Sequence, residues 1–205
     1  MSLIIVVPDG ILNDQKTTPT ISKTYQAALD LAINQATSSS SKIVLLPANS
    51  FGTSKNEQDY AEEYLIKKHI NKNFILKGIS NSESYISTRQ NFLLVMRNGV
   101  YNCGNKKIIR INNEIQKGIY TLISSHLHID RVLIILKHFN WIKPKKILVS
   151  YAEESTYITS RLIYYRFPGF RMLYEMLTIF AIEIEFKIKS ITKFKNQEKK
   201  TYTSK

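Results

Sequence analysis

A serine pair, a histidine and an arginine follow one another closely in the segment IYTLISSHLHIDRVLIIL, residues 119–136. Ser124 and Ser125 end an apolar run typical of a buried strand, and His128 and Arg131 follow, three residues apart. That spacing places His128 and Arg131 on one face of a helix, near its positive end. Arginine offers a two-pronged donor for phosphate or carboxylate, and histidine exchanges a proton near neutral pH. The segment therefore predicts a site in which His128 is catalytic and Ser124, Ser125 and Arg131 bind the ligand, although a lone His or Arg is more often structural.

Further polar residues follow other predicted strands. Asp9 and Gly10 follow the first strand, where glycine lets backbone amides approach an anion, although an ordinary turn explains the pair equally well. Thr88 and Asn91 belong to the cluster Ser87-Thr88-x-x-Asn91 at the start of a predicted helix, where the hydroxyl groups either cap the helix or help to hold an anion. Glu57 begins another helix, and its carboxylate also suits the helix dipole. We expect these five residues to complete the ligand-binding site.

The remaining reactive residue types show no comparable pattern. The single cysteine, Cys103, excludes an intrachain disulfide, and its turn-like surroundings disfavour a role as nucleophile. His126 and His138 have no matching partner and are interpreted as surface or packing residues. No set of His, Asp and Glu residues has the spacing of a metal site, so no metal is expected.

Strands and helices alternate along the chain, which predicts an α/β fold. The predicted strands span residues 3–7, 42–47, 73–77, 119–124 and 146–151. The predicted helices span residues 22–36, 57–70, 88–97, 127–139 and 171–186, and residues 98–118 are ambiguous. The alternation indicates a Rossmann-like three-layer sandwich with a mostly parallel central sheet of about five strands, the first of them central. Ligands of such folds bind outside the carboxyl ends of the strands, where the polar clusters lie.

The length of 205 residues suits one domain, residues 1–186, followed by a basic and flexible tail, residues 187–205, with seven lysines and one glutamate. The net charge of +13 favours anionic partners such as phosphorylated metabolites, nucleic acid or lipid surfaces. No apolar run is long enough for a spanning helix, and we expect a cytoplasmic protein, with peripheral membrane contact left open. The apolar stripe of the last helix favours core or dimer packing over a membrane anchor, and the oligomeric state stays open.

Four segments are together similar to a known family pattern. An apolar strand ends in a turn at Ile4–Gly10, and a helix begins within Ser54–Ala61. Ser87–Asn91 matches part of a Glu-x-x-Ser-x-Asn-Thr-x-x-Asn motif, and residues 124–131 match Thr-Ser-x-x-His-x-x-Arg in register. Over roughly residues 3–150 the chain thus resembles the YdcF-like family, the SanA/ElyC group of largely uncharacterised bacterial proteins, as a divergent member. It departs from the family where Pro8-Asp9-Gly10 replaces consecutive glycines.

The resemblance implies a Rossmann-like fold with a pocket for a nucleotide-like or phosphorylated small molecule. It also implies S-adenosylmethionine or a nucleotide as a candidate cofactor, and some relatives are linked to cell-envelope maintenance. If the chain is an enzyme, we expect a transferase or hydrolase that acts on an anionic small molecule through His128 and Arg131. The alternative is a basic surface-binding module for anionic membrane or nucleic acid, without catalysis. Nucleic acid is the less expected partner, because no aromatic-basic motif of a known nucleic-acid fold is present.

Overall fold

The computed structural model describes residues 2–9, 11–12, 20–49, 55–80, 87–152 and 168–202. In this part of the chain, seven strands form one sheet in the order β7-β6-β5-β4-β1-β8-β9, and β2 pairs with β3. The strands are β1 (Leu3–Val6), β2 (Ile11–Leu12), β3 (Thr20–Ile21), β4 (Lys42–Leu45), β5 (Ile75–Gly78), β6 (Val100–Asn102), β7 (Ile108–Ile109), β8 (Tyr120–Ser125) and β9 (Lys146–Ser150). The helices are α1 (Lys23–Ser39), α2 (Glu57–Lys67), α3 (Thr88–Asn98), α4 (Asn112–Gln116), α5 (Ile129–His138) and α6 (Pro168–Tyr202), with a short 3-10 turn at Lys72–Phe74.

The sheet is mostly parallel, which confirms the predicted fold class. Five strands run parallel, in the order β5-β4-β1-β8-β9, so the first strand is central as predicted. The count of seven exceeds the prediction because β6 and β7 add an antiparallel ladder beside β5. Both lie in the ambiguous stretch 98–118, where strands of three and two residues are too short to leave a periodic signal.

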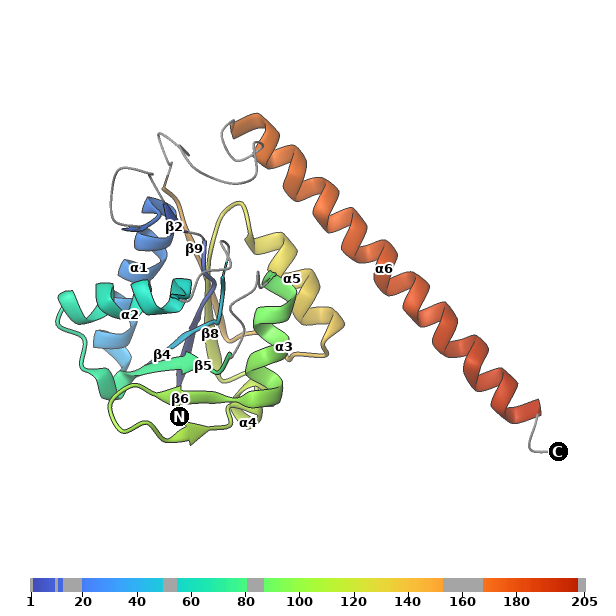
Figure 1. Ribbon diagram of the computed structural model, residues 1–205, viewed down its shortest axis with the longest axis horizontal. Coiled ribbons are helices and arrows are strands. Elements are labelled where there is room, and N and C mark those ends of the chain that lie inside the picture. Colours follow the sequence, from blue (N-terminus) through green and yellow to red (C-terminus); the bar gives the residue numbers. More distant parts are fainter. Residues whose placement is uncertain are drawn as a thin grey trace.

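Helices cover both faces of the sheet (Figure 1). The central strand β1 is apolar at every position and buried on both sides, as expected for a parallel strand between helical layers. Its even-numbered residues, Ile4 and Val6, pack with side chains of α1 and α2. Its odd-numbered residues, Leu3 and Ile5, pack with side chains of α3, α4 and α5. The result is a three-layer sandwich with one apolar cluster on each side of the sheet.

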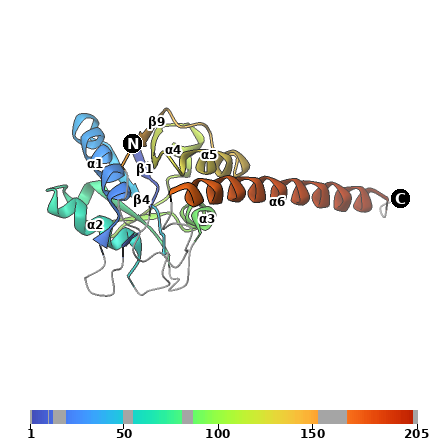
Figure 2. The ribbon, with the colours of Figure 1, turned by 90° about the horizontal axis from the view of Figure 1, so that it is seen from above.

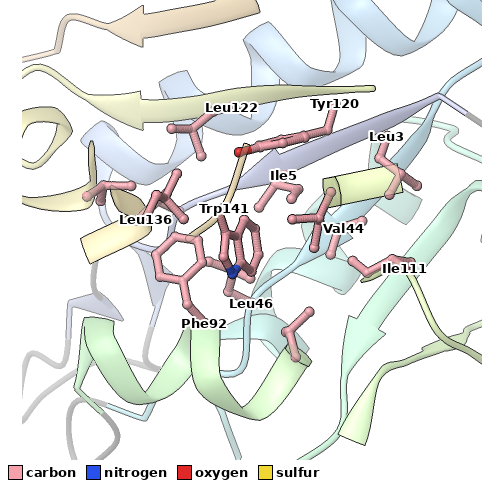
Figure 3. Close-up of a cluster of buried hydrophobic side chains, with 14 of the residues drawn as sticks. Leu3, Ile5, Val44, Leu46, Phe92, Ile111, Tyr120, Leu122, Leu136 and Trp141 are labelled. Atoms are coloured by element: carbon pink, nitrogen blue, oxygen red, sulfur yellow. The ribbon is translucent and has the colours of Figure 1, made fainter. Parts of the chain in front are cut away.

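Three aromatic rings lie at the centre of the cluster under α3 and α5 (Figure 3). Phe92 of α3 meets Trp141 edge to face, with ring centroids 5.3 Å apart. Trp141 in turn meets Tyr120 of β8, at 5.9 Å and with a similar T-shaped geometry. Edge-to-face pairs are favourable because the positive ring edge points at the negative ring face. These contacts fix α3 against the strand that leads to His128.

The last helix, α6, extends far beyond the rest of the molecule (Figures 1 and 2). Its first half packs on α5, where Phe186 stacks on His138 with ring centroids 3.7 Å apart. The predicted end near Phe186 is wrong, since the helix continues to Tyr202. No glycine or proline interrupts residues 170–202, so nothing in the sequence breaks the helix there. Within the described residues, no helix combines the length and the apolar character that crossing a membrane requires.

Candidate functional site

The carboxyl ends of β1 and β8 lie side by side at the point where the strand order reverses. β4 lies on one side of β1 and β8 on the other, which is the switch point where ligands of such sheets bind. Val6 pairs with Ile123, and the Val7 amide donates to the Ile123 carbonyl at 2.9 Å. Asp9, which follows β1, and Ser125, which ends β8, therefore lie at the same edge of the sheet. Gly10 lies outside the described residues.

His128 and Asp9 meet directly, as the topology predicts. His128 is the N-cap residue of α5, and its amide donates to the Ser125 carbonyl at 3.1 Å, in a tight turn after β8. This turn brings His128 Nε2 to 2.6 Å from Asp9 Oδ1. Both side chains are at least nine-tenths buried. A carboxylate against one ring nitrogen orients an imidazole and selects its tautomer.

Arg131 and Glu175 form a buried ion pair on the other side of His128. Arg131 Nε lies 3.3 Å from Glu175 Oε2, and each side chain is less than a tenth exposed. The Arg131 guanidinium also contacts His128 Nδ1, which itself lies 3.4 Å from Glu175 Oε1. Both ring nitrogens of His128 thus face charged protein groups. An imidazole placed between two carboxylates is a type of group that enzymes use as a general acid or base.

Glu175 comes from α6 and was not predicted as a site residue. A single carboxylate in the apolar run MLYEMLTIFAI was the available signal, because a Glu on a buried helix face needs a cation nearby. The carboxylate lies where Arg131 was predicted to hold the anionic group of a ligand. In this structure the chain's own carboxylate therefore occupies the predicted anion position.

Tyr25 of α1 was also not predicted as a site residue. It is completely buried, and its hydroxyl has no hydrogen-bond partner among the described residues. Burial, and then the nearby carboxylates of Glu57 and Asp9, raise the pKa of Tyr25 well above its usual value. Glu57 is buried too, and its amide donates to the Ala48 carbonyl after β4 at 2.9 Å. Asp9 and Glu57 therefore both lie close enough to the Tyr25 hydroxyl to act on its pKa.

The raised pKa of Tyr25 predicts a loss of stability in alkali. Above pH of about 10 the tyrosine of the unfolded chain loses its proton while the folded chain keeps it. The free energy of unfolding then falls by up to about 1.4 kcal/mol per pH unit for such a group, until the folded pKa is reached. Tyr25→Phe should reduce this slope in urea denaturation between pH 8 and pH 11. Tyr151→Phe is the control, since Tyr151 is 78% exposed, and equal slopes in both variants would contradict the prediction.

The other predicted ligand-binding residues take varied positions. Asn91 is buried, and its amide nitrogen can donate to the carbonyls of Pro47, at 2.6 Å, and Ser87, at 3.0 Å. Asn91 thus ties the first turn of α3 to the loop after β4, and the N-cap residue of α3 is Ser87, whose hydroxyl accepts from the Gln90 amide. Thr88 is the first residue of α3 and half-buried. Whether Thr88 and Asn91 bind a ligand stays a prediction.

Ser124 and Ser125 are both buried at the end of β8. Strand alternation directs Ser124 to the face of Leu122 and α5, and Ser125 to the face of Ile123 and α1. Neither hydroxyl has a hydrogen-bond partner within the described part of the chain. One serine thus lies on each face of the sheet, so the two hydroxyls do not point at the same space.

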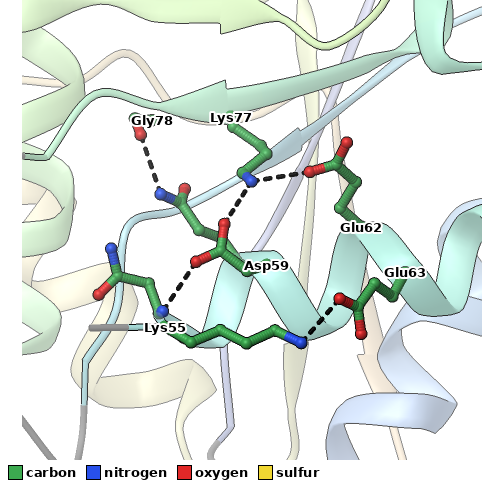
Figure 4. Close-up of polar contacts among 8 residues, drawn as sticks. Lys55, Asp59, Glu62, Glu63, Lys77 and Gly78 are labelled. Carbon is green, nitrogen blue, oxygen red and sulfur yellow. Dashed lines mark hydrogen bonds and ion pairs between the residues drawn. The ribbon is translucent and has the colours of Figure 1, made fainter. Parts of the chain in front are cut away.

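A second buried polar cluster orients α2 (Figure 4). Lys77 of β5 is 4% exposed and contacts Asp59 as well as Glu62, the latter at 2.7 Å. Burial lowers the pKa of Lys77, but its hydrogen bonds to Asp59 and Glu62 outweigh burial and raise it. Gln58 adds a hydrogen bond to the Gly78 carbonyl at 3.1 Å. Because every charge has a partner, the cluster fixes the start of α2, and with it Glu57.

The residue types that the sequence excluded from chemistry lie in packing positions. Burial, and then the Glu62 carboxylate, raise the pKa of the Cys103 thiol to about 12, so little thiolate exists at neutral pH. His126 stacks on Tyr151 with ring centroids 5.4 Å apart, and His138 stacks on Phe186. Among the described residues, no group of three or more His, Cys, Asp and Glu side chains is arranged to hold a metal ion.

The site thus consists of Asp9, His128, Arg131 and Glu175, with Glu57 and Tyr25 beside it, at the carboxyl ends of the central strands. It holds the acidic group of Glu175 against a guanidinium and places an imidazole between two carboxylates. Comparison of the chain with protein-family models, with curated proteins and with solved structures gives no match.

Proposed function

We propose that the chain binds a small molecule with a carboxylate or phosphate group at the carboxyl ends of β1 and β8. The observation that supports this is the carboxylate of Glu175, which lies against Arg131 and His128 in the protein interior. A guanidinium and an imidazole that accommodate a carboxylate there offer the acidic group of a ligand the same surroundings. The ligand would take the place of Glu175, and α6 would have to move to admit it.

The switch point and the resemblance to the YdcF-like family both favour a nucleotide-like or phosphorylated ligand, S-adenosylmethionine included. Such a molecule would place its acidic group on Arg131 and its polar groups near Asp9, Thr88 and Asn91. If the bound molecule reacts, His128 would serve as the acid–base residue, with Asp9 orienting its ring. Release of Glu175 would leave Arg131 beside the second ring nitrogen and open the position of the carboxylate to the ligand.

Removing the internal carboxylate is expected to strengthen ligand binding. The wild-type chain and Glu175→Gln would be screened by thermal shift with inorganic phosphate, nucleotides, S-adenosylmethionine and sugar phosphates. We expect affinity for the best ligand to rise about tenfold in Glu175→Gln, because each 1.4 kcal/mol of competing ion-pair energy is worth roughly that factor. The ligand must raise the unfolding temperature with increasing concentration.

The matched control is Glu185→Gln, on the same helix. Glu185 pairs with Arg89 at 2.7 Å, and both side chains are partly exposed, so its removal leaves the site untouched. A second variant, Glu175→Gln with Arg131→Gln, should lose the ligand. The proposal is wrong if no ligand stabilises either chain, or if stabilisation persists without Arg131.

A further inference from the structure

The first half of α6 is apolar on two opposite faces. One face contacts the rest of the protein through Glu175, Ile182 and Phe186. The opposite face carries six apolar side chains, each at least 40% exposed: Phe170, Leu173, Leu177, Phe180, Ile184 and Ile188. We call these six residues the outer face of α6. A helix that is apolar on both sides is normally covered on both sides.

The outer face is one continuous stripe. At 100° per residue, its six members lie within roughly 80° of arc, centred opposite Glu175. The stripe runs along most of the first twenty residues of a helix that is about 50 Å long at 1.5 Å per residue. Figure 2 shows the start of α6 beside α3 and α5 and the rest of the helix extending away from the molecule, and the outer face lies on the side of α6 opposite its contacts with the protein. Contiguous exposed apolar surface of this extent marks an interaction site.

The charge of the chain indicates which kind of partner covers the outer face of α6. Residues 187–202, the second half of α6, contain six lysines and one glutamate, and the whole chain carries +13. Two copies of the chain would repel each other, and pairing along α6 would bring their lysines into the same region. Nucleic acid would attract the lysines but would leave the apolar stripe uncovered. An anionic bilayer surface complements both features, because it accepts apolar side chains below a layer of negative headgroups.

We propose that the outer face of α6 lies in the surface of an anionic lipid bilayer. The helix would lie parallel to the membrane plane, with its outer face among the upper acyl carbons and its lysine-rich second half at the level of the headgroups. The sheet and the candidate site would remain on the aqueous side, since they lie on the opposite side of α6. This surface is distinct from the site at the carboxyl ends of β1 and β8, and the proposal does not depend on a ligand there.

Vesicle flotation of the full chain tests this proposal. Vesicles of phosphatidylcholine alone would be compared with vesicles that contain about a third phosphatidylglycerol. We expect binding to the anionic vesicles only, weakened on going from about 0.15 M to about 0.5 M salt. The double variant Leu177→Gln, Phe180→Gln should bind at least about tenfold more weakly. The matched control is Ile108→Gln, Ile142→Gln, which alters two apolar residues, 68% and 47% exposed, away from α6 and should bind as the wild type does.

Several outcomes would overturn the proposal. One is absence of flotation with anionic vesicles, and another is flotation that Leu177→Gln, Phe180→Gln does not weaken. A third is a concentration-dependent dimer, seen by analytical ultracentrifugation, that the same double variant abolishes, since a second copy would then cover the outer face. Preference for an RNA or DNA oligonucleotide over vesicles, unchanged in the double variant, would also exclude a lipid surface as the partner.

Discussion

Arg131→Met is expected to destabilise the protein by about 3–5 kcal/mol, the usual cost of removing one partner from a buried ion pair. Arg131 is 7% exposed and lies against Glu175 and His128, and Glu175 is 4% exposed. Methionine has nearly the same volume, so the change removes the charge and leaves the packing almost intact. The buried carboxylates of Asp9 and Glu175 would then share one imidazole. Urea denaturation at pH 7, monitored by Trp141 fluorescence and by circular dichroism, measures the loss.

Arg89→Met is the matched control, because Arg89 pairs with Glu185 on the same helix but is partly exposed. We expect it to cost no more than about 1 kcal/mol, as for other solvent-accessible pairs. The double variant Arg131→Met, Glu175→Leu should be more stable than Arg131→Met alone, since the unpaired carboxylate is gone. Equal losses in Arg131→Met and Arg89→Met would show that the buried charges do not determine the stability of this region.

The sheet could be predicted because the central strands have apolar sequences that can be recognised without knowing the rest of the fold. The stretches LIIV of β1 and KIVL of β4 are apolar at nearly every position, which is typical of strands covered on both faces. Alternation with amphipathic helices then left a parallel sheet as the simplest arrangement. By contrast, β6 and β7 have only three and two residues, and they depend on the antiparallel pairing of β6 with β5 and of β7 with β6. Short edge strands of this kind follow from tertiary contacts more than from their own sequence.

Part of the candidate site followed from the same topology. Asp9 and His128 both follow strands that are neighbours in a parallel sheet, so their contact at 2.6 Å needed only the correct strand order. Glu175 could not be placed in this way, because it lies on a helix that packs beside α5, outside the alternation of strands and helices. Periodicity showed that α6 has apolar faces but not which of them meets the protein. The partner of Arg131 depended on that choice.

The helix N-termini illustrate another limit. Thr88 and Asn91 have residue types that suit both a helix cap and an anion site, and their spacing is the same in either case. The structure gives the Asn91 amide two carbonyl partners within the protein, which local sequence could not distinguish from a ligand. Tyr25 is similar, since its helical position predicts burial but not that two carboxylates lie near its hydroxyl.

Phe92→Ala is expected to cost about 3–5 kcal/mol, which is typical of a buried phenylalanine. Phe92 is fully buried, packs edge to face on Trp141 and belongs to the apolar cluster under α3 and α5. Its removal would leave a cavity beside a rigid indole that also contacts Tyr120, so the surroundings can collapse only in part. Phe92→Leu keeps most of the volume and should cost less than about 2 kcal/mol. Urea denaturation at pH 7 distinguishes the two variants.

The matched control is Phe74→Ala. Because Phe74 is 40% exposed, its truncation should lower the free energy of unfolding much less. The Phe92 variants also test how the core supports the site, because Phe92 follows directly after Asn91 on α3. If α3 shifts in Phe92→Ala, the hydrogen bonds from Asn91 to Pro47 and Ser87 weaken with it, and hydrogen exchange at the start of α3 should accelerate. A cost similar to that of Phe74→Ala, with unchanged exchange in α3, would mean that the aromatic cluster does not anchor this helix.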